Sequence, residues 1–459
     1  MAWESIKITG RNNRNQPIPI PPAFWQSSPN FGLPKTTRLE SHRLFMSTNV
    51  LPTATYPFGY CTNVHAGTTL EQAQANLLKF ASPIQQQVCS PKQPALPVGL
   101  WLAEDAAIKL DQPGEAEGFR DWLHQNHFAA YTFNGFPQGD FHQPVVKHAV
   151  YSPTWQAPER LDYTMRLARI LSQLIPEGST GSISTLPLGW PHETWGQNNF
   201  QVCADHLLQL AEQLADLHES TGREIVVAIE PEPGCVLNTA PEMVAFFEDY
   251  LFSIEKAETA RRYLSICHDV CHSGVMFEPQ QAALKSYLDA GIRVGKVQVS
   301  SAVHIPWDSC QSDVDLGKDM LEQIRTLNEP KYLHQAARQA TNGGLDELCE
   351  DISVALSDWL PQKASEHTPE LPWRVHFHVP IFVEKFGCLE TTRADISEAT
   401  KFLVDNRKRQ IAGRDWFTGH YEVETYAWPV LPEELSEPDL SAGISKELQY
   451  FERILRGVA

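Results

Sequence analysis

Three acidic side chains and one histidine stand where a protein could hold a divalent cation. Glu230, Asp269 and Glu424 each close a short run of apolar or β-branched residues, and His272 follows Asp269 by three positions. Carboxylate oxygens and imidazole nitrogens are common ligands of divalent metals, and a carboxylate in a site can also serve as a general base. We therefore predict a metal site made of these four residues, in which Glu230 and Glu424 are also catalytic.

Six more polar residues lie at or just past strand-like runs and extend the predicted site. Gln298 stands between two valines and is a further possible metal ligand. Five others could bind substrate or a second metal: His65, Asn134, Glu232, His376 and His378. Structural explanations stay open beside these functional ones. Asp269 could cap a loop or a helix while His272 hydrogen-bonds locally. Glu230 and Glu232 could belong to a solvated acidic loop, and Gln298 could be satisfied within the core. His376 and His378 could lie on an exposed edge strand.

Distant residues can meet only if the fold brings the ends of several strands together. Strand-like runs alternate with helix-sized segments, which is typical of a parallel sheet with right-handed crossovers. In an eight-stranded β/α barrel, the active site lies at the C-terminal ends of the strands. We therefore expect an α/β fold, a (β/α)8 TIM barrel, with a doubly wound open sheet as the alternative. The runs are Phe58–His65, Val98–Leu102, Ala129–Asn134, Ser182–Pro187, Ile225–Glu230, Tyr263–Asp269, Arg293–Val299, Arg374–Pro380 and Tyr421–Tyr426.

Nine such runs exceed the eight that a barrel needs, so one of them must be inserted. Residues 301–370 break the alternation, and we place the run that follows, 374–380, in the same insertion. The expected organisation is a Pro-rich N-terminal arm at 1–55 and a single barrel domain at 56–459. The insertion then covers about 301–380 and lies between strands 7 and 8 of the barrel.

Capping signals mark where several helices should begin and end. Thr68 with Glu71, and Thr239 with Glu242, have the spacing of capping boxes. Gly222 is placed to end a long helix that begins near Phe200. These signals predict helices between the strand-like runs, as a barrel requires.

The charge balance and the cysteines limit the possible partners and location. Lys plus Arg number 37 against 56 Asp plus Glu, a net charge of −19, which repels nucleic acid and anionic membrane surfaces. No apolar run reaches the ~20 residues needed to span a bilayer, and Met1–Lys7 lack the apolar core of a signal peptide. The nine cysteines are scattered; Cys267 and Cys271 are four apart, but no second pair completes a zinc cage. We expect no disulfides, a cytoplasmic location and a small-molecule metabolite as partner.

The strand-end residues resemble those of a known family, the xylose-isomerase-like (sugar isomerase/epimerase) TIM-barrel superfamily. The resembling residues are Glu230, Asp269, His272, Gln298, and Glu424 followed by Thr425. The resemblance implies one to three divalent metals (Mn, Mg or Zn). It also implies their ligands: a Glu from the fifth strand, an Asp and a His near the sixth, a His from the seventh and a Glu from the eighth. Here Gln298 occupies the seventh-strand position.

A more specific resemblance rests on seven segments. They are Tyr60–His65, Phe133–Pro137, Gly181–Thr185, Glu230–Gly234, Cys267–His272, His376–Pro380 and Val423–Tyr426. Together they look like the metabolite traffic family EboE, over about residues 58–455. This resemblance implies a role in handling or exporting secondary-metabolite precursors, with partner proteins of the same pathway. It implies no defined reaction.

These features lead to three hypotheses about function, of which we favour the first. It is a metal-dependent enzyme that isomerises or epimerises a small polyol, sugar-like or cyclitol metabolite, with proton transfer by Glu230 and Glu424. The second is a multinuclear zinc hydrolase of endonuclease-IV-like type. Its further ligands would be His65, His272, His376 and His378. The third is a barrel that binds or hands over a metabolite without catalysis, because one fold hosts many activities.

Overall fold

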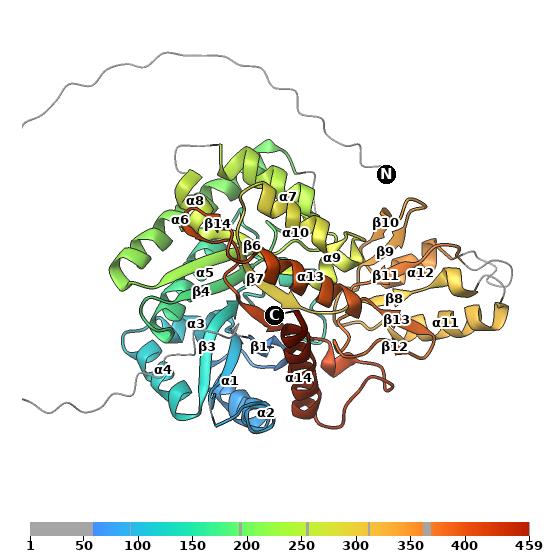
Figure 1. The fold of residues 1–459 in the computed structure, drawn as a ribbon, viewed down its shortest axis with the longest axis horizontal. Helices are drawn as coiled ribbons and strands as arrows, with labels where there is room; N and C mark the ends of the chain where they lie inside the picture. The colour runs from blue at the N-terminus through green and yellow to red at the C-terminus, as the bar shows by residue number, and fades with distance from the viewer. Residues whose placement is uncertain are drawn as a thin grey trace, which may run out of the picture. The chain divides into compact units, whose positions relative to one another are not determined.

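Eight parallel strands form a closed barrel. The computed structural model describes residues 58–91, 93–191, 195–253, 257–310, 313–360 and 369–458, so the expected arm at 1–55 lies outside the described residues. The barrel order is β1-β16-β7-β6-β5-β4-β3-β2, and helices surround the strands (Figure 1). The strands are β1 Phe58–Cys61, β2 Leu96–Trp101, β3 Phe128–Asn134, β4 Thr180–Thr185, β5 Glu224–Ile229, β6 Leu264–Asp269, β7 Val294–Val299 and β16 Tyr421–Val423. The predicted (β/α)8 barrel is confirmed, and the open-sheet alternative is wrong.

Alternate strand residues face the helices and the barrel axis. On β5, Ile225, Val227 and Ile229 pack in one core with residues of the surrounding helices. Inside the barrel, Lys296 of β7 and Glu422 of β16 form a buried ion pair of 2.7 Å, so side chains fill the axis. The helices of the barrel are α1 Leu70–Asn76, α2 Ser82–Val88, α3 Glu104–Leu110, α4 Glu115–Gln125, α5 Pro158–Leu174, α6 Gln197–Thr221, α7 Ala240–Phe246, α8 Ala257–Tyr263, α9 Val270–Val275, α10 Gln280–Asp289, α13 Arg393–Asn406 and α14 Leu440–Val458.

One of the two predicted capping boxes is confirmed. Thr239 begins α7 with Glu242, whose Oε2 accepts the Thr239 N–H at 3.0 Å. The box predicted at Thr68 is wrong by one residue, because Thr69 caps α1 and its N–H donates to Oε1 of Gln72 at 3.1 Å. An amide at the third helical position accepts the same hydrogen bond as a carboxylate, so the sequence offered two overlapping boxes.

Two element ends show how local chemistry sets a boundary. As predicted, Gly222 ends α6, with a φ of 66° in the left-handed region. The first strand is shorter than predicted: β1 stops at Cys61, and the 3-10 turn η1 (Thr62–Val64) carries the chain to His65. Oγ1 of Thr62 accepts the Trp101 N–H at 2.8 Å, so a side chain replaces the ladder bond there. The other 3-10 turns are η3 Lys147–Tyr151, η5 Trp307–Cys310 and η6 Trp428–Val430, and the π-helical segments η2 Leu77–Ala81 and η4 Phe247–Leu251 continue α1 and α7.

A second sheet lies between β7 and β16 in the sequence. Its six strands, in the order β10-β9-β11-β8-β13-β12, pair antiparallel. With α11 (Val314–Thr326) and α12 (Ile352–Asp358), they lie to one side of the barrel (Figure 1). The strands are β8 Val303–Ile305, β9 Ala336–Gln339, β10 Leu345–Cys349, β11 Trp373–Val375, β12 Lys385–Phe386 and β13 Leu389–Thr391. The predicted insertion between strands 7 and 8 of the barrel is therefore confirmed, but its sheet extends past the predicted end near 380, since β13 reaches Thr391. The run 374–380 belongs to the insertion, although only its beginning is a strand.

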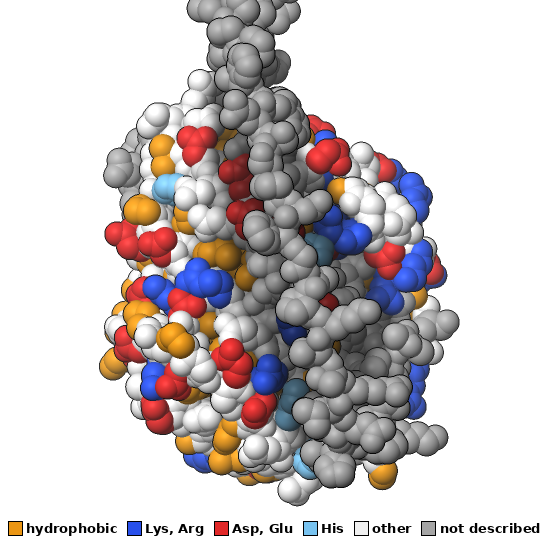
Figure 2. Space-filling view, turned by 90° about the vertical axis from the view of Figure 1, so that its left-hand side faces the viewer, with side chains coloured by type: hydrophobic (Ala, Val, Ile, Leu, Met, Phe, Trp, Pro, Cys, Tyr) orange, Lys and Arg blue, Asp and Glu red, His pale blue; other side chains and the backbone are white. Residues whose placement is uncertain are grey.

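The remaining features are a small hairpin, the state of the cysteines, the character of the helices and the distribution of surface charge. A two-stranded hairpin, β14 (Gln410–Ile411) with β15 (Arg414–Asp415), precedes β16. All nine cysteines are unpaired, as predicted. Within the described ranges, none of the helices combines the length and the apolar character needed to cross a bilayer. Figure 2 shows acidic and basic side chains interspersed over the coloured part of the face that it presents.

Candidate metal centre

Three carboxylates from separate strands meet at the C-terminal end of the barrel. Glu230 directly follows β5, Asp269 is the last residue of β6, and Glu424 directly follows β16. One oxygen of each lies within 4.8 Å of the other two, and the exposed fractions of the three residues are 3%, 2% and 5%. A closed parallel barrel directs all strand ends to one mouth, so the convergence follows from the fold.

The carboxylate cluster lacks a balancing charge. Among the described residues, no lysine or arginine pairs with Glu230, Asp269 or Glu424, and Lys296 is already paired with Glu422. Burial raises the pKa of all three carboxyl groups, and for Glu230 and Glu424 neighbouring carboxylates raise it further. Oε2 of Glu230 and Oδ2 of Asp269 have no hydrogen-bond partner. A divalent cation would supply both the charge and the missing contacts, so this donor set fits one.

Neighbouring groups hold two of these carboxylates by one oxygen each. Oε1 of Glu424 accepts hydrogen bonds from the side-chain amides of Asn63 at 2.6 Å and Asn134 at 2.9 Å. Oδ1 of Asp269 accepts from the Ser300 hydroxyl at 2.7 Å and from the backbone N–H three residues on at 2.9 Å. Asp269 does cap α9, as its structural explanation proposed, but capping uses Oδ1 alone. Such outer contacts orient ligands toward a metal.

Three histidines lie beside the carboxylates. His272 comes from α9, and His376 and His378 directly follow β11. Burial lowers the pKa of His272 to about 3 and that of His378 to about 4, and it lowers the pKa of His376 well below its ordinary value. The rings are therefore neutral at physiological pH. The alternative of an exposed edge strand is wrong, because β11 pairs with β8 and β9 on its two sides and both histidines are buried.

Glu232 is also buried in this cluster. Its Oε1 accepts hydrogen bonds from the Tyr151 hydroxyl at 2.7 Å and from Nε2 of Gln335 at 3.3 Å. Burial raises the pKa of Glu232 to about 8, so without a cation this carboxyl holds a proton at neutral pH. A carboxylate oxygen of Glu232 lies within 4.8 Å of ligand atoms of His272 and His376. The solvated-loop alternative is therefore wrong for Glu232, and burial rules it out for Glu230 as well.

A pocket opens over the cluster. Its cavity volume is about 60 Å³, which is small beside the ~300–1,000 Å³ of most small-molecule sites. Its walls are largely aromatic and aliphatic and include Phe136, Phe141, Val146, Val150, Tyr332, Leu333 and Tyr426. The predicted site residues that line it are Asn134, Glu230, Glu232, His272, His376, His378 and Glu424.

Three predicted residues, Asp269, Gln298 and His65, are not among those that line the pocket. Gln298 pairs in register with Asp269 and Glu422 on the neighbouring strands, and both of its amide atoms are buried without a hydrogen-bond partner. The alternative in which the Gln298 amide makes hydrogen bonds within the core is thus not supported. Its role as a metal ligand stays a prediction. His65 stacks on Phe80 with ring centroids 4.4 Å apart, so packing holds it away from the lining residues.

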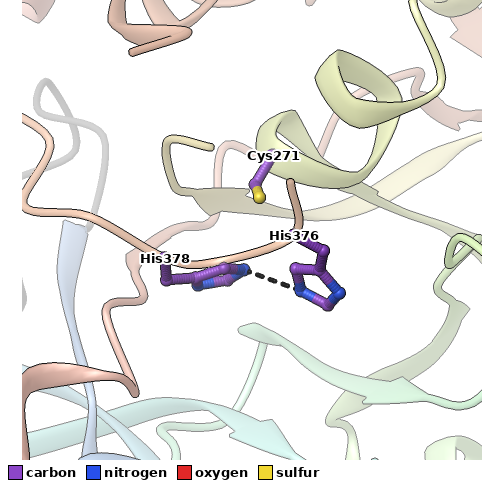
Figure 3. A group of neighbouring side chains, drawn as sticks. All are labelled: Cys271, His376 and His378. Atoms are coloured by element: carbon purple, nitrogen blue, oxygen red, sulfur yellow. Dashed lines mark hydrogen bonds between the residues drawn. The ribbon is translucent and has the colours of Figure 1, made fainter. Parts of the chain in front are cut away.

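Several residues that shape the site were not singled out by sequence reasoning. Asn63 lies in the first predicted strand, two residues before His65, and its polar side chain at a strand end was the available signal. Tyr151 and Gln335 lie outside every predicted strand and helix. Cys271 was weighed only as part of a cysteine cage, yet it lies near His376 and His378 (Figure 3).

Solved structures similar to this chain include three barrels with low sequence identity. An L-ribulose 3-epimerase has 10% identity and a TM-score of 0.42, with 87% of this chain and 95% of that one covered. A xylose isomerase-like TIM barrel protein from Mycobacterium smegmatis in complex with magnesium has 8% identity and a TM-score of 0.47, with 88% and 98% covered. The IOLI protein with a binding zinc atom has 9% identity and a TM-score of 0.41, with 88% and 99% covered. No protein-family model and no curated protein matches the sequence. Likeness at this level carries no argument about reaction or metal.

Proposed function

We propose that the protein is a cytoplasmic, metal-dependent enzyme that isomerises or epimerises a small polyol or sugar-like metabolite. The observation that supports this best is the meeting of Glu230, Asp269 and Glu424, with unpartnered oxygens on the first two, beside a pocket that Glu230 and Glu424 line. These residues, with His272 beside them, would hold Mn, Mg or Zn. A divalent cation bound there would polarise a carbonyl or hydroxyl oxygen of the substrate.

Glu230 and Glu424 have the properties of a proton-transferring pair. Both line the pocket, and burial together with nearby carboxylates raises the pKa of each. A raised pKa makes a carboxylate a stronger base toward a carbon-bound proton. We expect one of them to take the proton from the carbon next to the substrate carbonyl and the other to return it. Phe136 and Tyr426 in the pocket wall would limit access of water.

The metabolic role in this proposal is the handling of a secondary-metabolite precursor, together with partner proteins of the same pathway. Its support is the resemblance to the EboE family. Six of the seven segments that carry this resemblance contribute residues to the pocket lining, all except Gly181–Thr185.

Hydrogen exchange with solvent tests the proton transfer. Mn²⁺-loaded protein would be incubated in D₂O with a panel of ketoses, aldoses and cyclitol ketones, and mass spectrometry would measure deuterium at the carbon next to the carbonyl. We expect incorporation into at least one compound, and its loss in Glu424→Gln. Glu433→Gln, an exposed control, should exchange like the native chain. Exchange that survives in Glu424→Gln would overturn the assignment of that residue.

A multinuclear zinc hydrolase is the second candidate, favoured by the histidines that approach the carboxylates. Elemental analysis of the protein as purified separates the possibilities. Manganese or magnesium that exchanges at the carboxylate site favours the isomerase, whereas two or more zinc ions without deuterium exchange favour the hydrolase. No bound metal, with no exchange in the D₂O assay, favours a barrel that binds a metabolite without catalysis.

A further inference from the structure

The three imidazoles at the pocket meet in an arrangement that hydrogen bonds do not explain. Nε2 of His376 lies 3.2 Å from Nε2 of His272 and 3.3 Å from Nε2 of His378. The exposed fractions of His272, His376 and His378 are 5%, 4% and 1%. If these contacts were hydrogen bonds, one nitrogen in each pair would have to carry a hydrogen.

The opposite ring nitrogens show where the hydrogens are in two of the rings. Nδ1 of His272 lies 2.9 Å from the carbonyl oxygen of Pro231. Nδ1 of His378 lies 2.8 Å from the carbonyl oxygen of Glu424. A carbonyl oxygen only accepts hydrogen bonds, so Nδ1 is the donor in both rings.

The third ring is fixed by an amide whose orientation is itself fixed. Nδ1 of His376 lies 2.7 Å from Oε1 of Gln335. The amide nitrogen of Gln335 donates to the Tyr151 hydroxyl at 3.1 Å and to Glu232 at 3.3 Å. The amide oxygen must then face His376, so Nδ1 of His376 also donates.

With Nδ1 protonated in all three neutral rings, each Nε2 carries a lone pair and no hydrogen. Three buried lone pairs therefore face one another, which is repulsive unless a cation lies among them. A single added proton could serve one of the two contacts but not both. A histidine whose other N–H is held by an oxygen is the usual form of a metal ligand, and here all three rings are held in this way.

We propose that His272, His376 and His378 form a second cation site, suited to zinc, which adjoins the carboxylate site. Zinc accepts imidazole nitrogens readily, whereas magnesium and manganese favour carboxylate oxygens. Asp269 links the two sites, because its unpartnered Oδ2 lies 3.9 Å from Nε2 of His272. Oxygens of Asp269 lie within 4.8 Å of ligand atoms of His272 and His378, and also within 4.8 Å of carboxylate oxygens of Glu230 and Glu424. This site goes beyond the proposed isomerase, whose cation the three carboxylates can hold alone, and it takes the one free ring nitrogen of His272, Nε2.

The inserted sheet makes this second site possible. His376 and His378 directly follow β11, so a barrel without the insertion would supply only His272. Sγ of Cys271, in the first turn of α9, lies within 4.8 Å of ligand atoms of both inserted histidines (Figure 3). A coordinating thiol loses its proton, so Cys271 is the candidate fourth ligand.

Metal counting on the full chain tests the proposal. The protein would be stripped with a chelator and titrated with Zn²⁺, and bound zinc would be measured by elemental analysis after removal of free ions. We expect two zinc ions on the native chain and one on His376→Gln, on His378→Gln and on Glu230→Gln. His304→Gln, a control on β8 of the same inserted sheet, should still bind two. One zinc on the native chain, or two on the His376 and His378 variants, would overturn the proposal.

A second measurement needs no variant of a ligand. Nitrogen-15 NMR of the native chain should show the Nε2 signals of three histidines shifting as zinc is added, while their Nδ1 atoms stay protonated. Signals that do not change at zinc saturation would contradict the site. Gln335→Leu removes the acceptor that holds His376, and we expect zinc affinity at this site to fall about 10–100-fold while zinc at the carboxylate site is retained. Unchanged zinc affinity at this site in Gln335→Leu would contradict the arrangement in which Gln335 holds His376.

Discussion

The two ends of β5 each carry a glutamate, and the two have opposite surroundings. Glu224, at the start of the strand, lies 3.2 Å from Arg262, 3.2 Å from Arg293 and 2.6 Å from Arg414. Burial alone would raise the pKa of Glu224, but the Arg414 hydrogen bond and the arginine charges lower it below its ordinary value. Glu230, just past the other end, has no lysine or arginine partner among the described residues, and its pKa is raised.

This difference separates stability from chemistry along one strand. At the N-terminal end of the barrel, the charge of a buried acid is compensated by side chains of the chain itself. At the C-terminal end, three buried acids remain uncompensated. In such barrels, the N-terminal ends of the strands serve stability, whereas the C-terminal ends carry the active site. A local rule broken at a functional position is the expected pattern, and here the broken rule is charge pairing.

The largest expected effect comes from breaking the compensated end. Glu224→Gln would leave Arg293, which is buried, without its carboxylate partner. Removing one partner of a buried ion pair strongly destabilises. Such a loss costs ~3–5 kcal/mol. Because Arg262 and Arg414 are partly exposed, we expect Glu224→Gln to lower the unfolding free energy by about 3 kcal/mol, the lower end. Urea denaturation at neutral pH measures this loss.

The matched control for that variant is Glu258→Gln, on the exposed side of α8. A surface substitution of this kind should change the unfolding free energy by no more than about 0.5 kcal/mol. If the two variants lost the same stability, the arginine cluster would have no stabilising role.

The uncompensated end should respond in the opposite way. Glu230→Gln removes a desolvated acid from a crowded cluster, so in the presence of a chelator we expect unfolding free energy equal to or above that of the native chain. The cost should appear in metal binding instead. Loss of a direct ligand should weaken affinity at the carboxylate site by at least about 100-fold, since even outer contacts are worth 10–100-fold.

Denaturation in chelator and calorimetric titration with Mn²⁺ measure the two quantities on the same preparation. A metal-free Glu230→Gln chain that is clearly less stable than the native one would mean that this acid contributes to the fold and not to a site.

The carboxylates could be predicted from the sequence because each follows a strand with a clear pattern. Glu230, Asp269 and Glu424 needed only the rule that parallel strand ends share one mouth. The histidine arrangement could not be predicted in this way. His376 and His378 were noted as a pair, but the convergence of their Nε2 atoms depends on backbone carbonyls and on an amide from the inserted sheet, which no local pattern marks.

The same limit explains the residues whose prediction is not supported. Gln298 was placed by strand order, and the structure gives it the expected register beside Asp269 and Glu422 but no hydrogen bond from its amide. His65 was placed by a first strand that ends four residues earlier than predicted. The order of the strands predicts which residues lie near the mouth of the barrel. The backbone conformation at the end of each strand determines which of their side chains reach the site.

Glu447 on α14 sharpens the comparison, because it is a buried acid held by neutral donors. It accepts hydrogen bonds from the Ile381 N–H at 3.1 Å, the Thr425 hydroxyl at 2.6 Å and the Trp428 indole at 3.0 Å. Burial outweighs these contacts and raises the pKa of Glu447 to about 7. Hydrogen-bond donors alone therefore do not replace the arginines that surround Glu224.

The two acids should give opposite pH dependence of stability. For Glu447 the folded chain keeps a proton that the unfolded chain loses near pH 4.5. Its contribution is therefore full below that pH and falls as the pH rises to 7, by up to about 1.4 kcal/mol per pH unit. For Glu224, whose pKa is lowered, the contribution is present above the unfolded pKa and is lost as the pH falls. Urea denaturation in chelator at a series of pH values should show that the unfolding free energy falls less steeply from pH 4.5 to pH 7 in Glu447→Gln than in the native chain. An unchanged pH dependence would mean that the neutral donors keep Glu447 ionised. Burial would then raise the pKa of a carboxyl group too little to explain the difference between Glu224 and Glu230.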